Sequence, residues 1–454
     1  MLKKRITSKD ALIGIIGLGY VGLPLAVEMA EAGFQVHGLD IDGERLAKLK
    51  KGESYIIDVE SRRVADLIKR GLFQPQADFS IIKECDAVSI CVPTPLRKTK
   101  DPDVSYIISA VSVIKKYLHK GLLITLESTT YPGTTEELIQ REIEALGYRI
   151  GEDFFVCFSP ERVDPGNPVF NTKNTPKVIG GITSKCTEMG CLLYGQFLQK
   201  VIPVSSTKVA EMVKLLENTF RSVNIALVNE MALMCDRMGI DIWEVIDAAA
   251  TKPFGYMPFY PGPGIGGHCI PLDPLYLAWK AKTFNFYNKF IELASDINGN
   301  MPRYVVAKVM DALNMHRKSL LGSKVLILGM AYKKNIDDIR ESPALDLFTL
   351  LLEKGAEVHY HDPYIRSFNF GDAVIHSVDI SPETMKQYDC TVLATDHTDL
   401  DYAMISINAP LIVDTRNIFK DHRENIVKLG APQTSTARQG YQEVVTERVS
   451  NAKG

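Results

Sequence analysis

The sequence predicts an α/β protein with two parallel-sheet domains joined by a central helical region. Apolar runs of strand length alternate with helical patterns in the first and last parts of the chain, whereas the part between them has helical periodicity alone. At 454 residues the chain is also too long to fold around a single hydrophobic core. We therefore expect three domains, at residues 1–203, 204–305 and 306–454.

The first domain is expected to form a doubly wound, Rossmann-like sheet. A buried strand at residues 11–16 leads into a glycine-rich turn, a helix begins at Pro24, and a second strand at 34–40 ends in Asp40. Strands that alternate with helices are typical of parallel βαβ units. Further strands of this sheet are predicted at residues 86–92, 122–127 and 154–158.

The central domain is predicted to be helical. Apolar residues recur at the helical period between Lys208 and Met238, and residues 286–297 and 303–313 are further helical stretches. These helices carry more apolar residues than helices that only connect two domains would need. We therefore expect a homodimer that forms through this region.

The last domain repeats the α/β pattern and is expected to form a second Rossmann-like sheet. The polar tail after Ala431 is expected to be weakly ordered. Ligands bind at the carboxyl ends of the strands in such sheets, so the ligand cleft is expected between the two sheets. Strands of the second sheet are predicted at residues 324–329, 357–362, 390–394 and 410–413.

Composition argues against several classes of function. A net charge of −3 gives no general attraction for nucleic acid, and no run of about eighteen apolar residues is present to span a membrane. The eight cysteines show no metal-ligand spacing, which is typical of reduced thiols in a cytoplasmic protein without a structural metal. The apolar run at residues 11–16 is too short for a signal peptide and is expected to be a strand.

A glycine motif after the first strand indicates a dinucleotide site. Gly17, Gly19 and Gly22 have the G-x-G-x-x-G spacing, and Asp40 follows about twenty residues later. The first glycine makes the turn, the second admits the pyrophosphate at a helix N-terminus, and the third lets helix and strand pack. Asp40 would bind the ribose hydroxyls and repel a 2′-phosphate, which favours NAD over NADP. A glycine-rich turn without a ligand is the alternative.

The segment at residues 259–277 combines glycines, a thiol and a carboxylate. Four glycines at 262, 264, 266 and 267 would let the backbone pass close to a ligand, Cys269 follows at once, and Asp273 comes four residues later. The segment therefore resembles a substrate loop that carries a nucleophile. Asp273 and Pro274 also read as an N-cap with proline at the first helical position, and a lone cysteine is usually inert. On this segment alone both explanations stay open.

Polar residues form a stripe along the helix predicted between Lys208 and Met238. Such a stripe is usually a solvated face. Alternatively, Lys214 and Asn218 point into the expected cleft, one turn apart. The stripe consists of Glu211, Lys214, Asn218 and Ser222.

Further polar residues follow predicted strands. Thr129 lies just past the strand at 122–127, and Glu161 follows the strand at 154–158. Lys333 and Arg340 come after the first strand of the last domain. Alone, each is an ordinary surface residue. Together they place hydroxyls, acids and cations where parallel sheets hold ligands.

These motifs resemble the UDP-glucose/GDP-mannose dehydrogenase family over nearly the whole chain. The sequences of residues 159–166 and 261–274 are similar to those of the branch that acts on UDP-N-acetylhexosamines, in particular on UDP-N-acetylglucosamine. The likeness rests on Gly17-x-Gly19-x-x-Gly22, Val92-Pro-Thr-Pro95, Ser128-Thr129, Ser159-Pro-Glu161, Lys214-x-x-x-Asn218, Gly266-Gly-His-Cys269-x-x-x-Asp273 and Lys333-x6-Arg340.

The resemblance implies a four-electron oxidation that uses two NAD and turns a C6 hydroxyl into a carboxylate, for a surface polysaccharide precursor such as one of lipopolysaccharide. Cys269 would attack the intermediate aldehyde to give a thiohemiacetal, which is oxidised to a thioester and then hydrolysed. UDP-N-acetylglucosamine is the expected substrate. UDP-N-acetylmannosamine, UDP-N-acetylgalactosamine and UDP-glucose are alternatives, and a nucleotide-sugar-binding protein without activity is a different class.

The resemblance also implies roles for single residues. Lys214 and Asn218 would stabilise the oxyanion at C6, with Lys214 also a candidate base. Asp273 would assist proton transfer and water activation, while Thr129 and Glu161 would position the water. The cofactor site would comprise Gly17, Gly19, Tyr20, Val21, Gly22, Asp40, Arg45, Thr94, Thr129 and Arg340. The substrate site would comprise Glu161, Arg162, Lys214, Asn218, Tyr260, Gly266 and Lys333.

One position departs from the family pattern. Members that act on UDP-glucose have a second glutamate four residues after the Ser-Pro-Glu acid, and here that position is Pro165. The hydrolysis step has therefore lost one candidate carboxylate.

Overall fold

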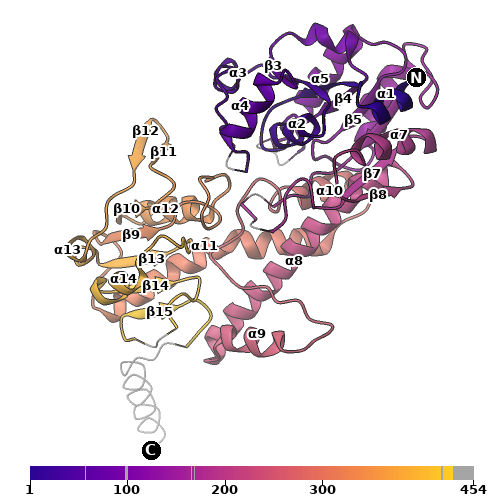
Figure 1. Cartoon of the computed structure of the whole chain (residues 1–454). Helices are drawn as coiled ribbons and strands as arrows, with labels where there is room; N and C mark the ends of the chain where they lie inside the picture. The colour runs from indigo at the N-terminus through magenta and orange to yellow at the C-terminus, as the bar shows by residue number, and fades with distance from the viewer. Residues whose placement is uncertain (57, 98–100, 165, 168, 421–422, 433–454) are drawn as a thin grey trace, which may run out of the picture. The chain divides into compact units, whose positions relative to one another are not determined.

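A computed structural model describes residues 1–56, 58–97, 101–164, 166–167, 169–420 and 423–432. Pro165 and most of the predicted polar tail lie outside these residues. The chain divides into two compact units, one of residues 1–218 and 273–287 and the other of residues 219–272 and 288–454 (Figure 1). The division into three domains remains a prediction.

The first unit contains an eight-stranded sheet in the order β3-β2-β1-β4-β5-β6-β7-β8. Its first six strands are parallel, and their order is that of dinucleotide-binding sheets. The expected Rossmann-like fold is confirmed. The strands are β1 (Leu12–Ile16), β2 (Gln35–Leu39), β3 (Phe73–Gln76), β4 (Ala87–Ile90), β5 (Leu123–Leu126), β6 (Phe155–Phe158), β7 (Lys177–Gly181) and β8 (Val201–Val204).

The sheet departs from the expected parallel pattern at β7. This strand runs antiparallel to β6, with Phe158 opposite Gly180. A parallel pair needs a crossover, usually a helix. The described part of residues 159–176 forms turns and no helix, so the chain reverses direction instead. As a result the first residue of β7, Lys177, lies beside the carboxyl end of β6.

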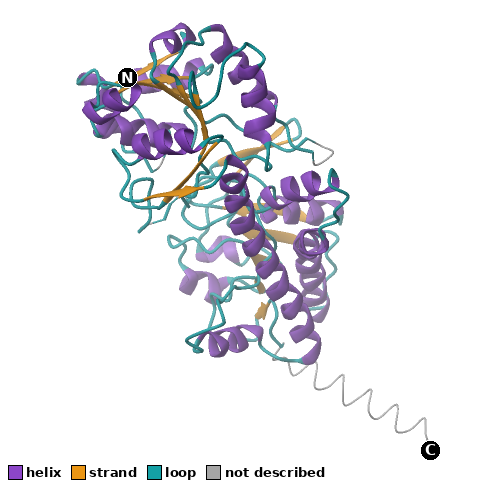
Figure 2. Cartoon of the chain, turned by 90° about the vertical axis from the view of Figure 1, so that its right-hand side faces the viewer, coloured by secondary structure: helices purple, strands orange, loops and turns teal. Residues whose placement is uncertain are grey.

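Helices cover both faces of this sheet (Figure 2). Adjacent residues of β1 point to opposite faces and pack into different hydrophobic clusters, Ile15 into one and Ile16 into the other. Continuous apolar strands are what a sheet buried on both faces requires. The helices of this unit are α1 (Leu2–Ser8), α2 (Gly22–Glu31), α3 (Gly43–Lys50), α4 (Ser61–Lys69), η1 (Phe79–Glu84), α5 (Ser105–Lys116), η2 (Glu136–Gln140), α6 (Arg141–Glu144), α7 (Ser184–Tyr194) and α10 (Asp273–Lys282).

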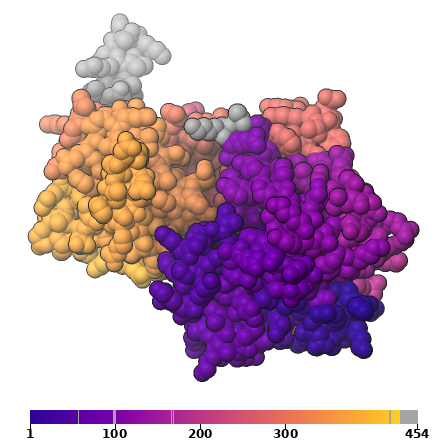
Figure 3. Space-filling view, turned by 90° about the horizontal axis from the view of Figure 1, so that it is seen from above, coloured from indigo at the N-terminus to yellow at the C-terminus, as the bar shows by residue number. Residues whose placement is uncertain are grey.

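Helix α1 was not predicted from the sequence. It is short and amphipathic, with Leu2 and Ile6 buried and the basic residues exposed. These N-terminal residues, indigo in Figure 3, lie at the surface of the first unit. Because only two apolar residues lie on its buried face, its sequence carries little helical periodicity.

The second unit contains a five-stranded parallel sheet in the order β10-β9-β13-β14-β15. The connections reverse direction between β9 and β13, and such a switch point is where doubly wound sheets bind ligands. The strands are β9 (Lys324–Leu328), β10 (Glu357–His361), β13 (Cys390–Leu393), β14 (Ile412–Asp414) and β15 (Ile426–Lys428), with a separate hairpin of β11 (Ser367–Phe370) and β12 (Ala373–His376).

Long helices supply the expected helical region. Helix α8 (Thr207–Met238) runs through both units, and α11 (Lys289–Met315) is one helix where two stretches were predicted. Pro302 lies inside α11 and is buried. The helix continues through it although proline lacks the N–H that an interior helical residue donates. The other helices are α9 (Ile242–Ala250), α12 (Pro343–Glu353), α13 (Pro382–Met385) and α14 (Tyr402–Asn408). Among the described residues, no helix is long and apolar enough to span a membrane.

Candidate active site

The turn from β1 into α2 has the shape that a dinucleotide site requires. Gly17 has a φ of +89°, and a Cβ on Gly22 would lie 1.8 Å from the Gly17 carbonyl oxygen. A side chain is therefore excluded at both positions. A Cβ on Gly19 would meet nothing within 4 Å, so the backbone there is open to a phosphate.

Asp40 is held at the end of β2 by backbone hydrogen bonds. Its Oδ2 accepts from the Leu18 N–H at 2.8 Å, and its Oδ1 accepts from the Asp42 N–H at 3.0 Å. Arg45 lies beside it, with Nη1 3.9 Å from Asp40 Oδ2. The carboxylate is thus oriented beside the glycine turn, as recognition of an adenosine ribose requires.

Thr94 lies in the loop after β4, the strand next to β1 on the side where the strand order reverses. It is buried, and its carbonyl oxygen accepts a hydrogen bond from the Tyr276 hydroxyl of α10. Tyr20, on the glycine turn, is exposed. The residues around the switch point of this sheet therefore fit NAD.

The polar stripe of α8 is not a solvated face. Glu211, Lys214 and Ser222 are buried and Asn218 is half-buried. Glu211 accepts hydrogen bonds from the N–H groups of Gly133 (2.5 Å) and Thr135 (2.9 Å), which fixes the turn after β5. Solvation, the usual explanation of such a stripe, is therefore wrong here.

Two hydrogen bonds link this stripe to predicted catalytic residues of the first unit. Lys214 Nζ donates to the Thr129 hydroxyl, and Asn218 Nδ2 donates to Asp273 Oδ2 at 2.5 Å. Thr129 follows β5, and Asp273 begins α10. The structure thus places four of the six predicted catalytic residues in direct contact as two pairs.

Asp273 is 2 % exposed, and this burial raises the pKa of its carboxyl group to about 6. The Lys214 ammonium and the Asn218 amide each oppose the rise. A carboxylate of this pKa is largely ionised at neutral pH yet binds a proton far more readily than an ordinary aspartate. Such a group suits general acid–base catalysis.

Glu161 follows β6 and is held from both sides. Its Oε1 accepts from the N–H groups of Arg162 and Val163, each at 2.8 Å, and its Oε2 lies 3.1 Å from Lys177 Nζ. Burial would raise the pKa of Glu161, but Lys177, the Val163 N–H and the charge of Lys214 lower it overall. Glu161 is therefore ionised at neutral pH.

Arg162, predicted to bind substrate, makes contacts within the protein. Its guanidinium donates to the carboxylate of Glu217 at 2.6 and 3.2 Å and to the Pro176 carbonyl oxygen at 2.7 Å. A role in substrate binding remains a prediction.

Cys269 belongs to the second unit, although only three residues separate it from Asp273. Its loop is tied down through the backbone. The Gly262 N–H donates to Asn229 Oδ1 at 3.0 Å, and the Gly267 N–H donates to the Arg340 carbonyl oxygen at 3.0 Å. The Leu272 N–H donates to the carbonyl oxygen of Cys269 at 3.1 Å, which closes a turn before α10.

The glycines of this loop make room for protein groups. A Cβ on Gly266 would lie 2.5 Å from Tyr332 Cβ, and Gly267 has a φ of +90° with the Tyr332 ring beside it. The structure thus shows protein groups beside Gly266 and Gly267, whereas the predicted close approach of a ligand to this loop remains a prediction. Contact between Gly266 and a substrate remains a prediction.

The remaining predicted residues of the second unit lie in two places. Tyr260 stacks on Trp243, with ring centroids 6.0 Å apart. Lys333 and Arg340 lie in the loop after β9, at the switch point of the sheet, and Arg340 Nη2 lies 2.6 Å from Asp338.

A buried pair that sequence reasoning missed fixes the loop after β9. Asp362 accepts hydrogen bonds from the N–H groups of Met330 (2.7 Å) and Ala331 (2.9 Å) and from His397 Nε2 (3.0 Å). His397 Nδ1 accepts from the Asn335 N–H at 3.0 Å, so Nε2 carries the proton. Asp362 ends β10 as Asp40 ends β2, and this parallel is the sequence signal that was available.

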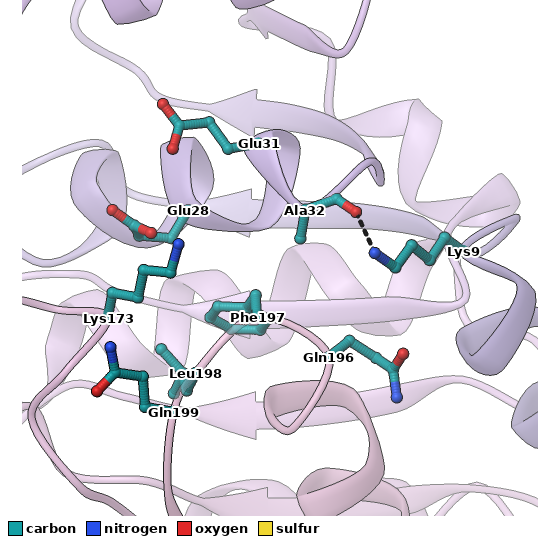
Figure 4. Close-up of a pocket in the computed structure, with 9 residues that line it drawn as sticks. All are labelled: Lys9, Glu28, Glu31, Ala32, Lys173, Gln196, Phe197, Leu198 and Gln199. Carbon is teal, nitrogen blue, oxygen red and sulfur yellow. Dashed lines mark hydrogen bonds between the residues drawn. The ribbon is translucent and has the colours of Figure 1, made fainter.

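A pocket of about 400 Å³ lies elsewhere on the first unit (Figure 4). It contains none of the predicted site residues. Charges of both signs line it, and Lys9 Nζ donates to the Ala32 carbonyl oxygen at 2.6 Å. The lining residues are Lys9, Glu28, Glu31, Ala32, Lys173, Gln196, Phe197, Leu198 and Gln199.

The described residues hold no group of three or more His, Cys, Asp or Glu side chains placed to bind a metal ion. All eight cysteines lie in the described part of the chain, and none of them forms a disulfide.

Comparison with known proteins identifies the family. The models of the UDP-glucose/GDP-mannose dehydrogenase family match residues 11–198 (NAD binding domain), 208–300 (central domain) and 326–421 (UDP binding domain). The chain belongs to this family of NAD-dependent nucleotide-sugar dehydrogenases. NAD is accordingly the cofactor of the first unit, and the last domain is of the UDP-binding type.

Relatives cover nearly the full chain. A UDP-N-acetyl-D-mannosamine dehydrogenase of Methanococcus maripaludis is 35% identical over 421 residues, or 90% of this chain and 93% of the relative. A UDP-N-acetyl-D-glucosamine 6-dehydrogenase of Pseudomonas aeruginosa is 36% identical over 396 residues, or 86% and 92%. The solved structure of the UDP-D-ManNAc dehydrogenase from Pyrococcus horikoshii has a TM-score of 0.85 at 34% identity, and covers 92% of this chain and 99% of that chain.

Proposed function

We propose that this protein oxidises the C6 hydroxyl of UDP-N-acetylglucosamine to a carboxylate in two NAD-dependent steps, for synthesis of a surface polysaccharide precursor. The observation that carries the proposal is the pair of hydrogen bonds from one face of α8, Lys214 to Thr129 and Asn218 to Asp273. Cys269 precedes this Asp273 by four residues, the spacing that the family pattern has. Similarity to the UDP-N-acetyl-D-glucosamine 6-dehydrogenase of Pseudomonas aeruginosa supports UDP-N-acetylglucosamine as the substrate.

The side chains have complementary tasks in the proposed reaction. Lys214 and Asn218 donate hydrogen bonds to the oxygen at C6 as negative charge develops on it. Bound NAD supplies the hydride acceptor. Cys269 sulfur holds the sugar through a thiohemiacetal and a thioester while the cofactor is exchanged. Asp273, with its pKa near 6, accepts a proton from the reacting hydroxyl or water.

A second candidate substrate is UDP-N-acetylmannosamine. Relatives of comparable identity carry that name, both in Methanococcus maripaludis and in the solved structure from Pyrococcus horikoshii. The two sugars differ only in configuration at C2, and the reaction at C6 is the same for both. The catalytic groups therefore do not distinguish them.

We propose that the protein is a homodimer that forms through the central helices. Helix α8 has its apolar stripe outside: Val209, Leu216, Phe220 and Leu227 are all exposed. Of its polar stripe, Glu211, Lys214 and Ser222 are buried and Asn218 is half-buried. An exposed apolar stripe of this length on a long helix is typical of a protein–protein interface.

We further propose that the enzyme works in the cytoplasm. A catalytic thiol must stay reduced, and cysteines without disulfides are typical of a reducing compartment.

The test is a panel of UDP-sugars followed by NADH absorbance. UDP-N-acetylglucosamine should give the highest kcat/KM and two NADH per sugar acid. Cys269→Ala should abolish turnover, whereas the matched control Cys191→Ala, in α7, should retain it. One NADH per product would point to a simple alcohol dehydrogenase, and a higher kcat/KM on UDP-N-acetylmannosamine would favour the second candidate.

A further inference from the structure

A buried group of three charges lies at the carboxyl edge of the first sheet. Lys177 Nζ is 2.6 Å from Glu127 Oε2 and 3.1 Å from Glu161 Oε2. The side chains of Lys177 and Glu127 are 5 % and 0 % exposed, and that of Glu161 is 13 % exposed. We call these three residues the Lys177 triad.

The fold delivers the three charges from three neighbouring strands. Glu127 follows β5 and Glu161 follows β6, two parallel strands that end at the same edge. Strand β7 runs the other way, so its first residue, Lys177, reaches that edge as well. A parallel β7 would have placed Lys177 at the opposite edge of the sheet.

Glu127 anchors the triad within the core. Besides Lys177, it accepts a hydrogen bond from the hydroxyl of Tyr194, whose oxygen lies 3.2 Å from Ser89 Oγ. Both Tyr194 and Ser89 are buried. Lys177 therefore lies between two carboxylates: that of Glu127, which is fixed within the core, and that of Glu161.

The triad leaves Glu161 a single orientation. One oxygen of its carboxylate is held by two backbone N–H groups and the other by Lys177. A buried ion pair is seldom more stabilising than apolar side chains of the same volume. The presence of these charges is therefore better explained by a need to fix a carboxylate than by a need for stability.

We propose that Lys177, anchored by Glu127, is a positioning residue for the hydrolysis step, because it fixes the carboxylate of Glu161 that orients the attacking water. This inference rests on the proposed function. It also fits the departure from the family pattern at position 165. With proline there, Glu161 is the glutamate that remains to orient the water, and the triad sets its orientation.

Hydrolysis of the thioester is the step that Lys177 serves. Water adds through its oxygen to the C6 carbonyl carbon of the thioester. The C6–sulfur bond then breaks, and its electron pair leaves with the sulfur of Cys269. The water loses its protons, one to the Asp273 carboxylate and one to the departing thiolate, and the sugar carboxylate is released. No electron acceptor takes part, so loss of Lys177 should leave both oxidations intact.

The experiment compares Lys177→Met with Lys177→Arg in the full-length protein. In single-turnover mixing with NAD and UDP-N-acetylglucosamine, Lys177→Met should still release two NADH per active site in a burst. Its steady-state turnover should fall on the order of 10- to 100-fold, the range known for the loss of a side chain that orients a metal ligand. Intact-mass spectrometry should then show the sugar bound to Cys269. Lys177→Arg should restore turnover to within a few-fold.

A double-mutant cycle with Glu161→Gln separates positioning from structural support. If Lys177 acts through Glu161, adding Lys177→Met to Glu161→Gln should cost no further turnover. Additive losses, or a burst that slows in parallel with the steady state, would overturn the inference. If Lys177→Met does not fold, as judged by circular dichroism, Glu127→Gln replaces it in the same cycle. Wild-type protein that makes no NADH from any UDP-sugar would instead refute the proposed function.

Discussion

Asp273 combines deep burial with two partners that favour its charged form. With a pKa of about 6, kcat should rise with pH through that value, because the ionised carboxylate is the form that accepts a proton. Glu161 contributes no such limb, since its pKa is lowered. Asp273→Asn should reduce kcat on the order of 100- to 10,000-fold and remove the limb. A pH profile that keeps its acidic limb in the variant would contradict the role.

The same carboxyl group makes stability fall as pH rises, whereas it makes kcat rise. Its folded-state pKa lies above its unfolded value of 3.8, so its contribution to stability is complete below pH 4 and is lost as pH rises through 6. The loss amounts to about 3 kcal/mol at most. Asp273→Asn should therefore melt at a higher temperature than wild type at pH 8.

Asp40 is oriented by backbone hydrogen bonds toward the glycine turn. Asp40→Ala should raise the KM for NAD about 10-fold or more, because the ribose loses a charged acceptor, and should improve NADP relative to NAD. Steady-state kinetics with both cofactors measures this. Asp66→Ala, an exposed residue of α4, is the matched control. An unchanged ratio would refute the assignment.

At the scale of residues, the motifs indicated which side chains would lie together, whereas the roles of these side chains remain predictions. The motif residues Lys214, Asn218 and Asp273 are brought into contact as pairs with their partners. Lys177 was not predictable, since the sequence gives no sign that β7 reverses. His397 was missed because its partner Asp362 lies 35 residues away along the chain, and the available signal, an acid at the end of β10, marked only Asp362.

At the scale of elements, the loop after β9 depends on a buried histidine. His397→Ala would remove the hydrogen-bond donor to Asp362 and the acceptor for the Asn335 N–H. We expect this loss to lower the free energy of unfolding by about 1–3 kcal/mol. The loop carries Lys333, so the KM for the UDP-sugar should rise while kcat changes little. His316→Ala, at the exposed end of α11, should behave as wild type. An unchanged KM would show that the loop does not need this contact.

Strand positions were largely predictable because buried parallel strands are continuous apolar runs. Five of the first six strands were predicted, and their alternation with helices indicated a doubly wound sheet. Strand β3 was missed, because its four residues alternate buried and less buried positions and include Pro75. The direction of β7 was not predictable, because direction depends on whether the preceding segment forms a helix. The unbroken helix α11 was missed for a related reason: tertiary packing decides whether a proline ends a helix.

At the scale of the whole molecule, α8 turns its polar stripe in and its apolar stripe out. Leu227→Glu should convert the proposed dimer to a monomer, because a charge would be buried at the interface. Light scattering at micromolar concentration measures the mass. Ile407→Glu changes an apolar residue of α14 that is also exposed and should leave the dimer intact. A wild-type mass equal to one chain would contradict the proposal.

The path of the loop that carries Cys269 is set by main-chain groups at Gly262, Gly267 and Leu272. Side chains between these points, such as Ile265 and Ile270, do not supply those three bonds. We therefore expect a library at Ile265 and Ile270 alone to keep these three bonds, with Gly264 and Gly266 left unchanged. Selection among such variants offers a route to redesigning which sugar the enzyme prefers.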